Sequence, residues 1–293
     1  MANTHILSRE FEYLEPRTVE EALSLLISHR NKTRVMAGGT DLLVQMKMGK
    51  VDPECVINLG RIPALRYLIV DKGLRIGTLT SFWQIEKHAV LREKYTALFE
   101  AASAVTSVQI KHMGTLGGNL CNASPAADSA PPLLVFGAKV RLVTGDNDRI
   151  LPLEDFFLGP GQTVLSPGEL LLEIQLPEVL PHTGSAFLKM ARVSADLAKV
   201  SVAVKVVREG EVCKDCRIAF GSVAKIPIRT PEAEKILKGK TLDKKRLEEV
   251  SRRTSEEIQP ITDIRSTAWY RKDICRVLVR DAINTAWIRA AGP

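Results

Sequence analysis

Two pairs of adjacent glycines are the features of this chain best suited to chemistry. The first pair belongs to the stretch 37–41, Ala-Gly-Gly-Thr-Asp, and the second to the stretch 114–119, Gly-Thr-Leu-Gly-Gly-Asn. Glycine lets a backbone turn sharply and approach a ligand closely. Free N–H groups at the start of a following helix bind anions, most often phosphate. Either pair alone is equally consistent with an ordinary turn. Together they predict two anion cradles for one ligand with two charged groups, such as a dinucleotide pyrophosphate.

The segments around these glycines predict how they are positioned. An apolar run at 35–37 predicts a strand before the first pair, and residues 42–48 predict a short helix after it. We expect the second pair to lie in a loop that follows a helix at 91–105. Thr115 and Asn119 flank this pair and carry side chains that both donate and accept hydrogen bonds.

The order of the predicted elements divides the chain into three units. Residues 1–59 predict a small α/β unit, whose first helix opens with a capping box formed by Thr18 and Glu21. Residues 60–176 alternate hairpins with helices and predict an α+β unit. Residues 177–293 predict an antiparallel sheet covered by helices. The fold class we expect is therefore α+β.

Several other segments predict particular helices and strands. In the middle unit we expect hairpins, a helix that Ser81 caps, and a helix at 126–136 with its two prolines near the start. In the last unit the predicted strands are 186–190, 201–208 and 212–222, and the predicted helices are 231–238, 243–258 and 267–289.

Composition and charge exclude some classes of function. The chain has 293 residues, a net charge of +7 and only 5% aromatic residues, and its basic residues are mixed with acidic ones. Nucleic-acid binding favours a concentrated basic stripe with aromatic platforms, so we expect no nucleic-acid partner. No apolar run approaches the ~20 residues of a membrane span, and the first residues do not resemble a secretory signal. We expect a cytoplasmic protein.

Cysteines and histidines predict no metal site and no catalytic side chain. Five scattered cysteines indicate reduced thiols, and Cys213 and Cys216, although spaced C-x-x-C, fall inside a strand pattern with no second pair to complete a zinc site. The five histidines show no metal-ligand spacing. His112, close to the second glycine pair, is expected to be a surface or loop residue, although a covalent flavin link is conceivable there. The nicotinamide fingerprint G-x-G-x-x-G, the P-loop and G-x-S-x-G are all missing from the sequence.

The glycine motifs resemble a known family when they are combined with four later ones. These are 123–128 (Ala-Ser-Pro-Ala-Ala-Asp), 165–169 (Leu-Ser-Pro-Gly-Glu), 187–192 (Phe-Leu-Lys-Met-Ala-Arg) and 219–224 (Ala-Phe-Gly-Ser-Val-Ala). In this order they are similar to the FAD-binding medium subunit of the molybdenum hydroxylases, the carbon monoxide dehydrogenase and xanthine dehydrogenase group. The resemblance covers nearly the whole chain.

The resemblance implies a fold and a set of residues around the cofactor. Two N-terminal subdomains of the vanillyl-alcohol-oxidase (PCMH) type would hold non-covalent FAD between them, and the C-terminal domain would cover the flavin. Asp128 would accept hydrogen bonds from the ligand, although from its residue type alone it is an N-cap for the helix near 130. Lys189 would approach the pyrimidine end of the flavin, where the alternative is an exposed strand lysine. The full predicted set is Val35, Met36, Ala37, Gly38, Gly39, Thr40, Asp41, Val105, Thr115, Gly117, Gly118, Asn119, Asp128, Leu165, Lys189 and Leu197.

The resemblance also implies a function and partners. The chain would be an electron-transfer subunit that passes electrons from [2Fe-2S] clusters of a small partner subunit through FAD to NAD, a quinone or another acceptor. A large molybdopterin subunit would complete the assembly, expected as a dimer of heterotrimers. No side chain would act as nucleophile or base, since the cofactor does the chemistry. The alternative is a free-standing flavin-dependent oxidase or reductase of the same fold.

Overall fold

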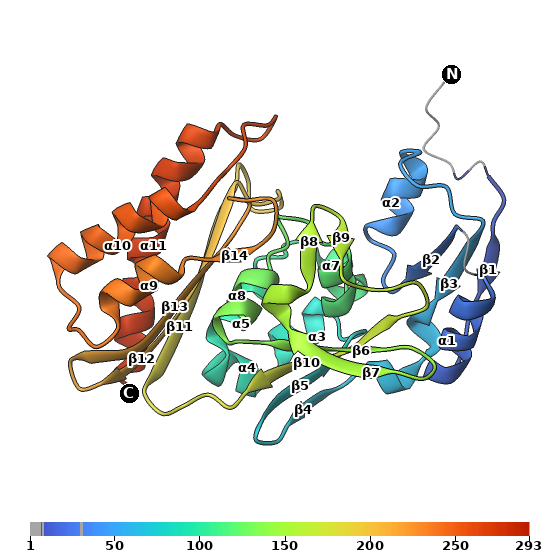
Figure 1. Ribbon diagram of the computed structural model, residues 1–293, viewed down its shortest axis with the longest axis horizontal. Coiled ribbons are helices and arrows are strands. Elements are labelled where there is room, and N and C mark those ends of the chain that lie inside the picture. Colours follow the sequence, from blue (N-terminus) through green and yellow to red (C-terminus); the bar gives the residue numbers. More distant parts are fainter. Residues whose placement is uncertain (1–6, 8, 30–31, 293) are drawn as a thin grey trace.

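The computed structural model describes residue 7 and residues 9–29 and 32–292, and it consists of three main sheets with their helices (Figure 1). The strands are β1 (Glu12–Leu14), β2 (Thr33–Met36), β3 (Cys55–Asn58), β4 (Leu68–Val70), β5 (Gly73–Gly77), β6 (Lys139–Val143), β7 (Asp148–Pro152), β8 (Phe157–Gly159), β9 (Gln162–Thr163), β10 (Leu170–Pro177), β11 (Thr183–Met190), β12 (Val200–Glu209), β13 (Val212–Gly221) and β14 (Ile228–Arg229). The helices are α1 (Val19–Ser28), α2 (Leu42–Lys47), α3 (Phe82–Lys87), α4 (Ala89–Lys94), α5 (Thr96–Ser103), α6 (Val108–Met113), α7 (Leu116–Cys121), α8 (Ala130–Val135), α9 (Pro231–Leu237), α10 (Lys244–Glu257) and α11 (Ala268–Ala290). The predicted α+β class is confirmed.

The N-terminal sheet is parallel, with strand order β1-β3-β2. Its helix α1 begins as predicted, because the Thr18 hydroxyl accepts a hydrogen bond from Glu21 N at 3.1 Å. The capping box is incomplete, since the Glu21 carboxylate accepts from Arg17 N instead of Thr18 N. The first glycine pair follows β2 directly, and α2 comes next. The predicted strand–glycine–helix order is therefore present.

The middle sheet is antiparallel, with strand order β4-β5-β10-β6-β7. Helices α3 to α8 belong to this part of the chain, and all of them except α6 share one buried core with the sheet. The capping box at Ser81 is complete, with Gln84 as the reciprocal partner. Figure 1 places this sheet between the N-terminal unit at one end of the molecule and the C-terminal unit at the other.

The C-terminal sheet has the order β11-β12-β13-β14 and is antiparallel throughout. Helices α9 and α11 pack on it and α10 packs on both of them, whereas α5 and α8 of the middle unit contact the same strands. In Figure 1 the sheet stands between these two groups of helices. The predicted helix-covered antiparallel sheet is confirmed.

Four expectations about local structure need correction. The single helix predicted at 91–105 is two helices, α4 and α5, separated by Tyr95, whose φ/ψ of −114°/46° is not helical. The second glycine pair lies in the first turn of α7, where a loop was expected. Helix α8 begins only at Ala130, with both prolines in its first turn as predicted. Strand β11 begins three residues earlier than the predicted 186–190.

The buried cores cross the predicted unit boundaries. Leu79, Leu170 and Leu172 of the middle unit pack into the core of the N-terminal sheet. Phe187 and Ala219 of the C-terminal sheet pack into the core of the middle unit. The predicted unit boundaries after residues 59 and 176 stay predictions. Because each of these cores includes residues of a neighbouring unit, the packing favours units that depend on one another for their cores. No helix in the described part of the chain combines the length and apolarity that a membrane crossing demands.

A polar contact joins the middle and C-terminal units. The Glu100 carboxylate on α5 accepts from Phe187 N at 2.8 Å and from the Arg289 guanidinium at 2.6 Å. Removing it leaves a partly buried N–H and a guanidinium without their acceptor. We therefore expect Glu100→Ala to lower the free energy of unfolding by about 1–3 kcal/mol in chemical denaturation. Glu93→Ala, on the exposed side of α4, is the control and should change it by less than about 0.5 kcal/mol. Equal losses in both variants would contradict the role of Glu100.

Candidate functional site

One cavity of about 710 Å³ collects residues from all three units. It is lined by the loop between β2 and α2, by α7 and the segments on either side of it, by the connection before β10, and by β11 with the residues that follow. All sixteen residues of the predicted set line this cavity. The structure thus brings together residues that are up to 162 positions apart in the sequence, from Val35 to Leu197. That each one contacts a cofactor stays a prediction.

The first glycine loop offers a run of free donors to this cavity. Gly39 has φ +71°, a left-handed conformation that favours glycine. Within the described part of the chain, no hydrogen bond engages the backbone N–H groups of residues 38–41. Successive N–H groups in such a turn form a concave anion site. The loop therefore offers free N–H groups in a turn of this kind, and that it binds an anion stays a prediction.

Gly38 has a second, structural requirement. A Cβ atom at this position would lie far inside van der Waals contact with the Met113 carbonyl oxygen. Met113 ends α6, immediately before the second glycine motif. The missing side chain thus allows the two glycine motifs to meet backbone to backbone. A Cβ on Gly118, by contrast, would be in ordinary van der Waals contact with Ala37 Cβ at 3.6 Å, and its tight neighbour would be the Thr115 hydroxyl at 2.8 Å.

In the second glycine motif the N–H groups at the start of α7 are engaged within the protein, whereas no hydrogen bond among the described residues engages Thr115 N. Leu116 N donates to Thr80 O at 2.9 Å, Gly117 N donates to Thr78 O at 3.0 Å, and Gly118 N donates to the Thr115 hydroxyl at 3.1 Å. A Cβ on Gly117 would collide with the Thr78 side chain. These glycines therefore let α7 pack against the segment after β5, and a second anion cradle in this motif stays a prediction.

Asn119 is oriented by a neighbour that the sequence did not single out. Its Oδ1 accepts from the buried Ser129 hydroxyl at 2.6 Å. This bond occupies the amide oxygen, so the NH₂ group of Asn119 is the donor left for the cavity.

Asp128 and Lys189 form an ion pair across two units of the fold. Lys189 Nζ lies 2.7 Å from Asp128 Oδ2, and the two side chains are only 12% and 11% exposed. Burial raises the pKa of Asp128, while the Lys189 charge and its hydrogen bond oppose that shift. Asp128 Oδ1 is buried, and no hydrogen-bond partner for it exists among the residues that the structure describes. The N-cap and exposed-lysine alternatives are both wrong, because Ser129 is the N-cap of α8 and Lys189 is largely buried.

The segment that carries Leu165 is held by a second ion pair. Arg149 donates to both carboxylate oxygens of Glu169, at 2.7 and 2.8 Å, and to Val164 O at 2.9 Å. Glu169 also accepts from Ser166 N at 2.9 Å. These contacts hold the pKa of Glu169 below its usual range, despite its burial. The family-like motif 165–169 included Glu169, but nothing local pointed to Arg149.

A smaller cavity of about 510 Å³ lies on the other side of the first glycine loop. Met36, Ala37, Gly38 and Thr115 line both cavities. His112 lines only the smaller one, where its exposed ring stacks on Trp83 with the ring centroids 4.9 Å apart. His112 is therefore a surface residue on α6, away from the larger cavity.

Comparison with known proteins places this geometry in a family. Residues 9–179 match the model described as FAD binding domain in molybdopterin dehydrogenase. The chain belongs to this family, the FAD-binding medium subunits of the molybdenum hydroxylases. Residues 185–286 match the carbon monoxide dehydrogenase flavoprotein C-terminal domain. The members of this family that the chain resembles are flavoprotein subunits of oxidoreductases.

Three relatives illustrate the similarity. The glyceraldehyde dehydrogenase medium chain of Sulfolobus acidocaldarius is 31% identical over 94% of this chain and 98% of its own length. The xanthine dehydrogenase FAD-binding subunit of Escherichia coli O157:H7 is 29% identical over 96% and 97%. The solved carbon monoxide dehydrogenase from Hydrogenophaga pseudoflava matches with a TM-score of 0.93 and 30% identity over 96% and 98%.

The contact between Gly38 and Met113 gives a direct test of this site. Gly38→Ala should push the two motifs apart and lower the flavin content of the purified protein by at least tenfold, measured by absorbance per chain. Gly145→Ala is the matched control, because a Cβ at that position would meet only the Ile27 side chain at 3.5 Å. Full flavin content in Gly38→Ala would show that the motifs need not touch.

Proposed function

We propose that this chain is the FAD-binding, electron-transfer subunit of a molybdenum-containing hydroxylase or dehydrogenase. The observation that carries the proposal is the shared cavity, in which a run of free N–H groups from one unit faces the buried Asp128–Lys189 pair that joins the other two. An anion cradle and a polar, partly charged wall suit a ligand with a pyrophosphate and several hydroxyl groups.

Three features of the cavity fit FAD. The N–H groups of residues 38–41 are available for pyrophosphate oxygens. Asp128 Oδ1 is a buried acceptor without a partner, so a ligand hydroxyl or amino group would satisfy it. The Leu165 segment provides an apolar wall that the Arg149–Glu169 pair fixes in place. We propose that the predicted set of sixteen residues surrounds FAD without a covalent bond.

The chain's own residues would bind and orient the cofactor. FAD accepts and donates electrons singly or in pairs, so it connects one-electron carriers to two-electron acceptors. Lys189 would hold positive charge beside the ring system, and Asp128 would keep the lysine in place. Leu197, which is exposed at the edge of the cavity, leaves that side accessible to an acceptor such as NAD or a quinone.

The partners belong to the same proposal. We infer a large molybdopterin subunit and a small [2Fe-2S] subunit in a dimer of heterotrimers, located in the cytoplasm. The names of the relatives, which include medium chains and an FAD-binding subunit, support this assembly. The complete assembly should co-purify with a tagged form of this chain from its native cells, with equal amounts of all three chains in the soluble fraction. Recovery of the tagged chain alone, with flavin and full reductase or oxidase activity, would favour the free-standing alternative.

The charge on Lys189 should tune the reduction potential of the bound flavin. Lys189→Gln removes a cation that favours the negatively charged reduced ring, so we expect the midpoint potential to fall. A change of about 30 mV corresponds to about 1.4 kcal/mol for a two-electron couple. Potentiometric titration followed by absorbance measures the shift, and Lys189→Arg, which keeps the charge, is the control. An unchanged potential in Lys189→Gln would contradict the proposed role.

A further inference from the structure

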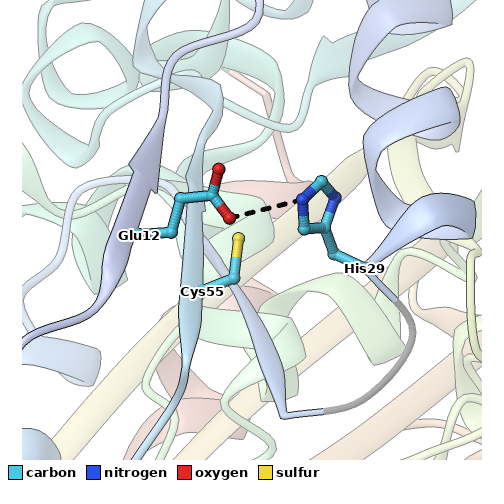
Figure 2. Close-up of side chains that lie close together, drawn as sticks. All are labelled: Glu12, His29 and Cys55. Atoms are coloured by element: carbon cyan, nitrogen blue, oxygen red, sulfur yellow. Dashed lines mark ion pairs between the residues drawn. The ribbon is translucent and has the colours of Figure 1, made fainter.

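Three side chains of metal-ligating types converge at the N-terminal sheet, away from the cavity. Glu12 is the first residue of β1, Cys55 is the first residue of β3, and His29 caps the end of α1. Their ligand atoms all lie within 4.8 Å of one another, and Figure 2 shows the three side chains pointing toward a common center. The residues are far apart in the sequence, so residue spacing alone predicted no metal site.

Strand register explains why Glu12 and Cys55 meet. Parallel pairing places Glu12 of β1 directly beside Cys55 of β3, and Thr33 of β2 lies beside Cys55 on its other side. Glu12, Thr33 and Cys55 are the first residues of their strands. The cluster therefore lies at the end of the sheet where the strands start. The first glycine loop follows Met36, at the opposite end of β2. None of the three ligand candidates lines either cavity.

Hydrogen bonds fix which nitrogen of His29 faces the cluster. Its Nδ1 lies 2.8 Å from Ser28 Oγ and 3.1 Å from Leu25 O, so this nitrogen points away from the cluster. Its Nε2 lies 3.3 Å from Glu12 Oε2. In the tautomer that carries its proton on Nδ1, the Nε2 lone pair faces this carboxylate oxygen, and a cation between them would satisfy both. A backbone carbonyl that holds the distal N–H is the usual support of a metal-binding histidine.

We propose that Glu12, His29 and Cys55 bind a zinc-class divalent ion. Thiolate, imidazole and carboxylate form a mixed donor set that tetrahedral Zn²⁺ accepts, with water as the fourth ligand. Bound ligands lie about 2.0–2.3 Å from zinc, so shifts of about 1 Å bring these atoms to coordination distance. The Cys55 thiol is 3% exposed, whereas the Glu12 side chain is 55% exposed and gives the ion its entry.

The bound ion would cross-link three elements of the N-terminal unit. It would connect β1, the end of α1 and β3 at the end of the sheet where the strands start. Zinc coordinates the thiolate form of cysteine, so binding through Cys55 would release the thiol proton. This inference is independent of the FAD proposal, since its residues lie outside the cavity.

Zinc analysis of the whole purified chain tests the site. After chelator treatment and dialysis against Zn²⁺, we expect one zinc per chain by elemental analysis. Glu12→Gln and His29→Gln should weaken zinc binding at least about tenfold and leave the flavin content unchanged. Both side chains are at least partly exposed, so these variants should fold. Glu20→Gln, on the exposed face of α1, is the control and should bind zinc normally.

Cobalt(II) provides a second readout for the thiolate. Added to the stripped chain, it should give a difference spectrum with a thiolate-to-metal band that Cys55→Ser loses and Cys275→Ser keeps. Zinc should also raise the melting temperature of the native chain and not that of Glu12→Gln. A native chain that retains no zinc, or equal zinc affinity in the native chain, Glu12→Gln and His29→Gln, would overturn the proposal. In that case Glu12 and His29 form only the direct contact at 3.3 Å, with no metal between them.

Discussion

The close approach of Gly38 to the carbonyl oxygen of Met113 is the contact on which the rest of the site depends. Only a residue without a side chain permits this distance between the N-terminal and middle units. The contact fixes where the loop 37–41 lies, and therefore where its free N–H groups point. The same loop forms a wall of two cavities, so a shift of its backbone would change both. Packing between the two units therefore already requires glycine at position 38, whether or not a ligand is bound.

The C-terminal unit contributes the charged side chain of Lys189 to the wall of the cavity. Lys189 reaches from β11 to Asp128, and the Glu100 carboxylate ties α5 to β11 and α11. A buried ion pair recovers its desolvation cost only with good geometry and further hydrogen bonds. Asp128 keeps one oxygen without a partner, which is the arrangement expected of a residue whose remaining acceptor belongs to a ligand. In the proposed function, the Asp128 carboxylate would therefore both join two units of the fold and bind the cofactor.

The sequence predicted the parts of this protein that local patterns encode. The strand–glycine–helix order at 35–48, the caps at Thr18 and Ser81 and the long strands of the C-terminal sheet have strong local signals. Helix α7 was missed because two glycines disfavour a helix, whereas backbone bonds to Thr78 and Thr80 stabilise its first turn. Tyr95 interrupts a helical pattern because its ring is buried and its hydroxyl bonds to Pro177 O.

Contacts between residues that are distant in the sequence could not be predicted from local patterns. Arg149 and Glu169 lie 20 residues apart, and Glu12, His29 and Cys55 meet only through strand register and the end of a helix. All sixteen residues predicted from the resemblance nevertheless line the larger cavity, because most of them belong to motifs that the resemblance located by their order along the chain.

The central claim is that this cavity holds FAD without a covalent bond. The most direct measurement is the visible absorption spectrum of the purified chain, followed by acid precipitation and quantification of the released flavin. The account predicts a yellow protein that releases one FAD per chain into the supernatant. A colourless protein that takes up no added FAD, or colour that stays with the precipitate, would contradict it.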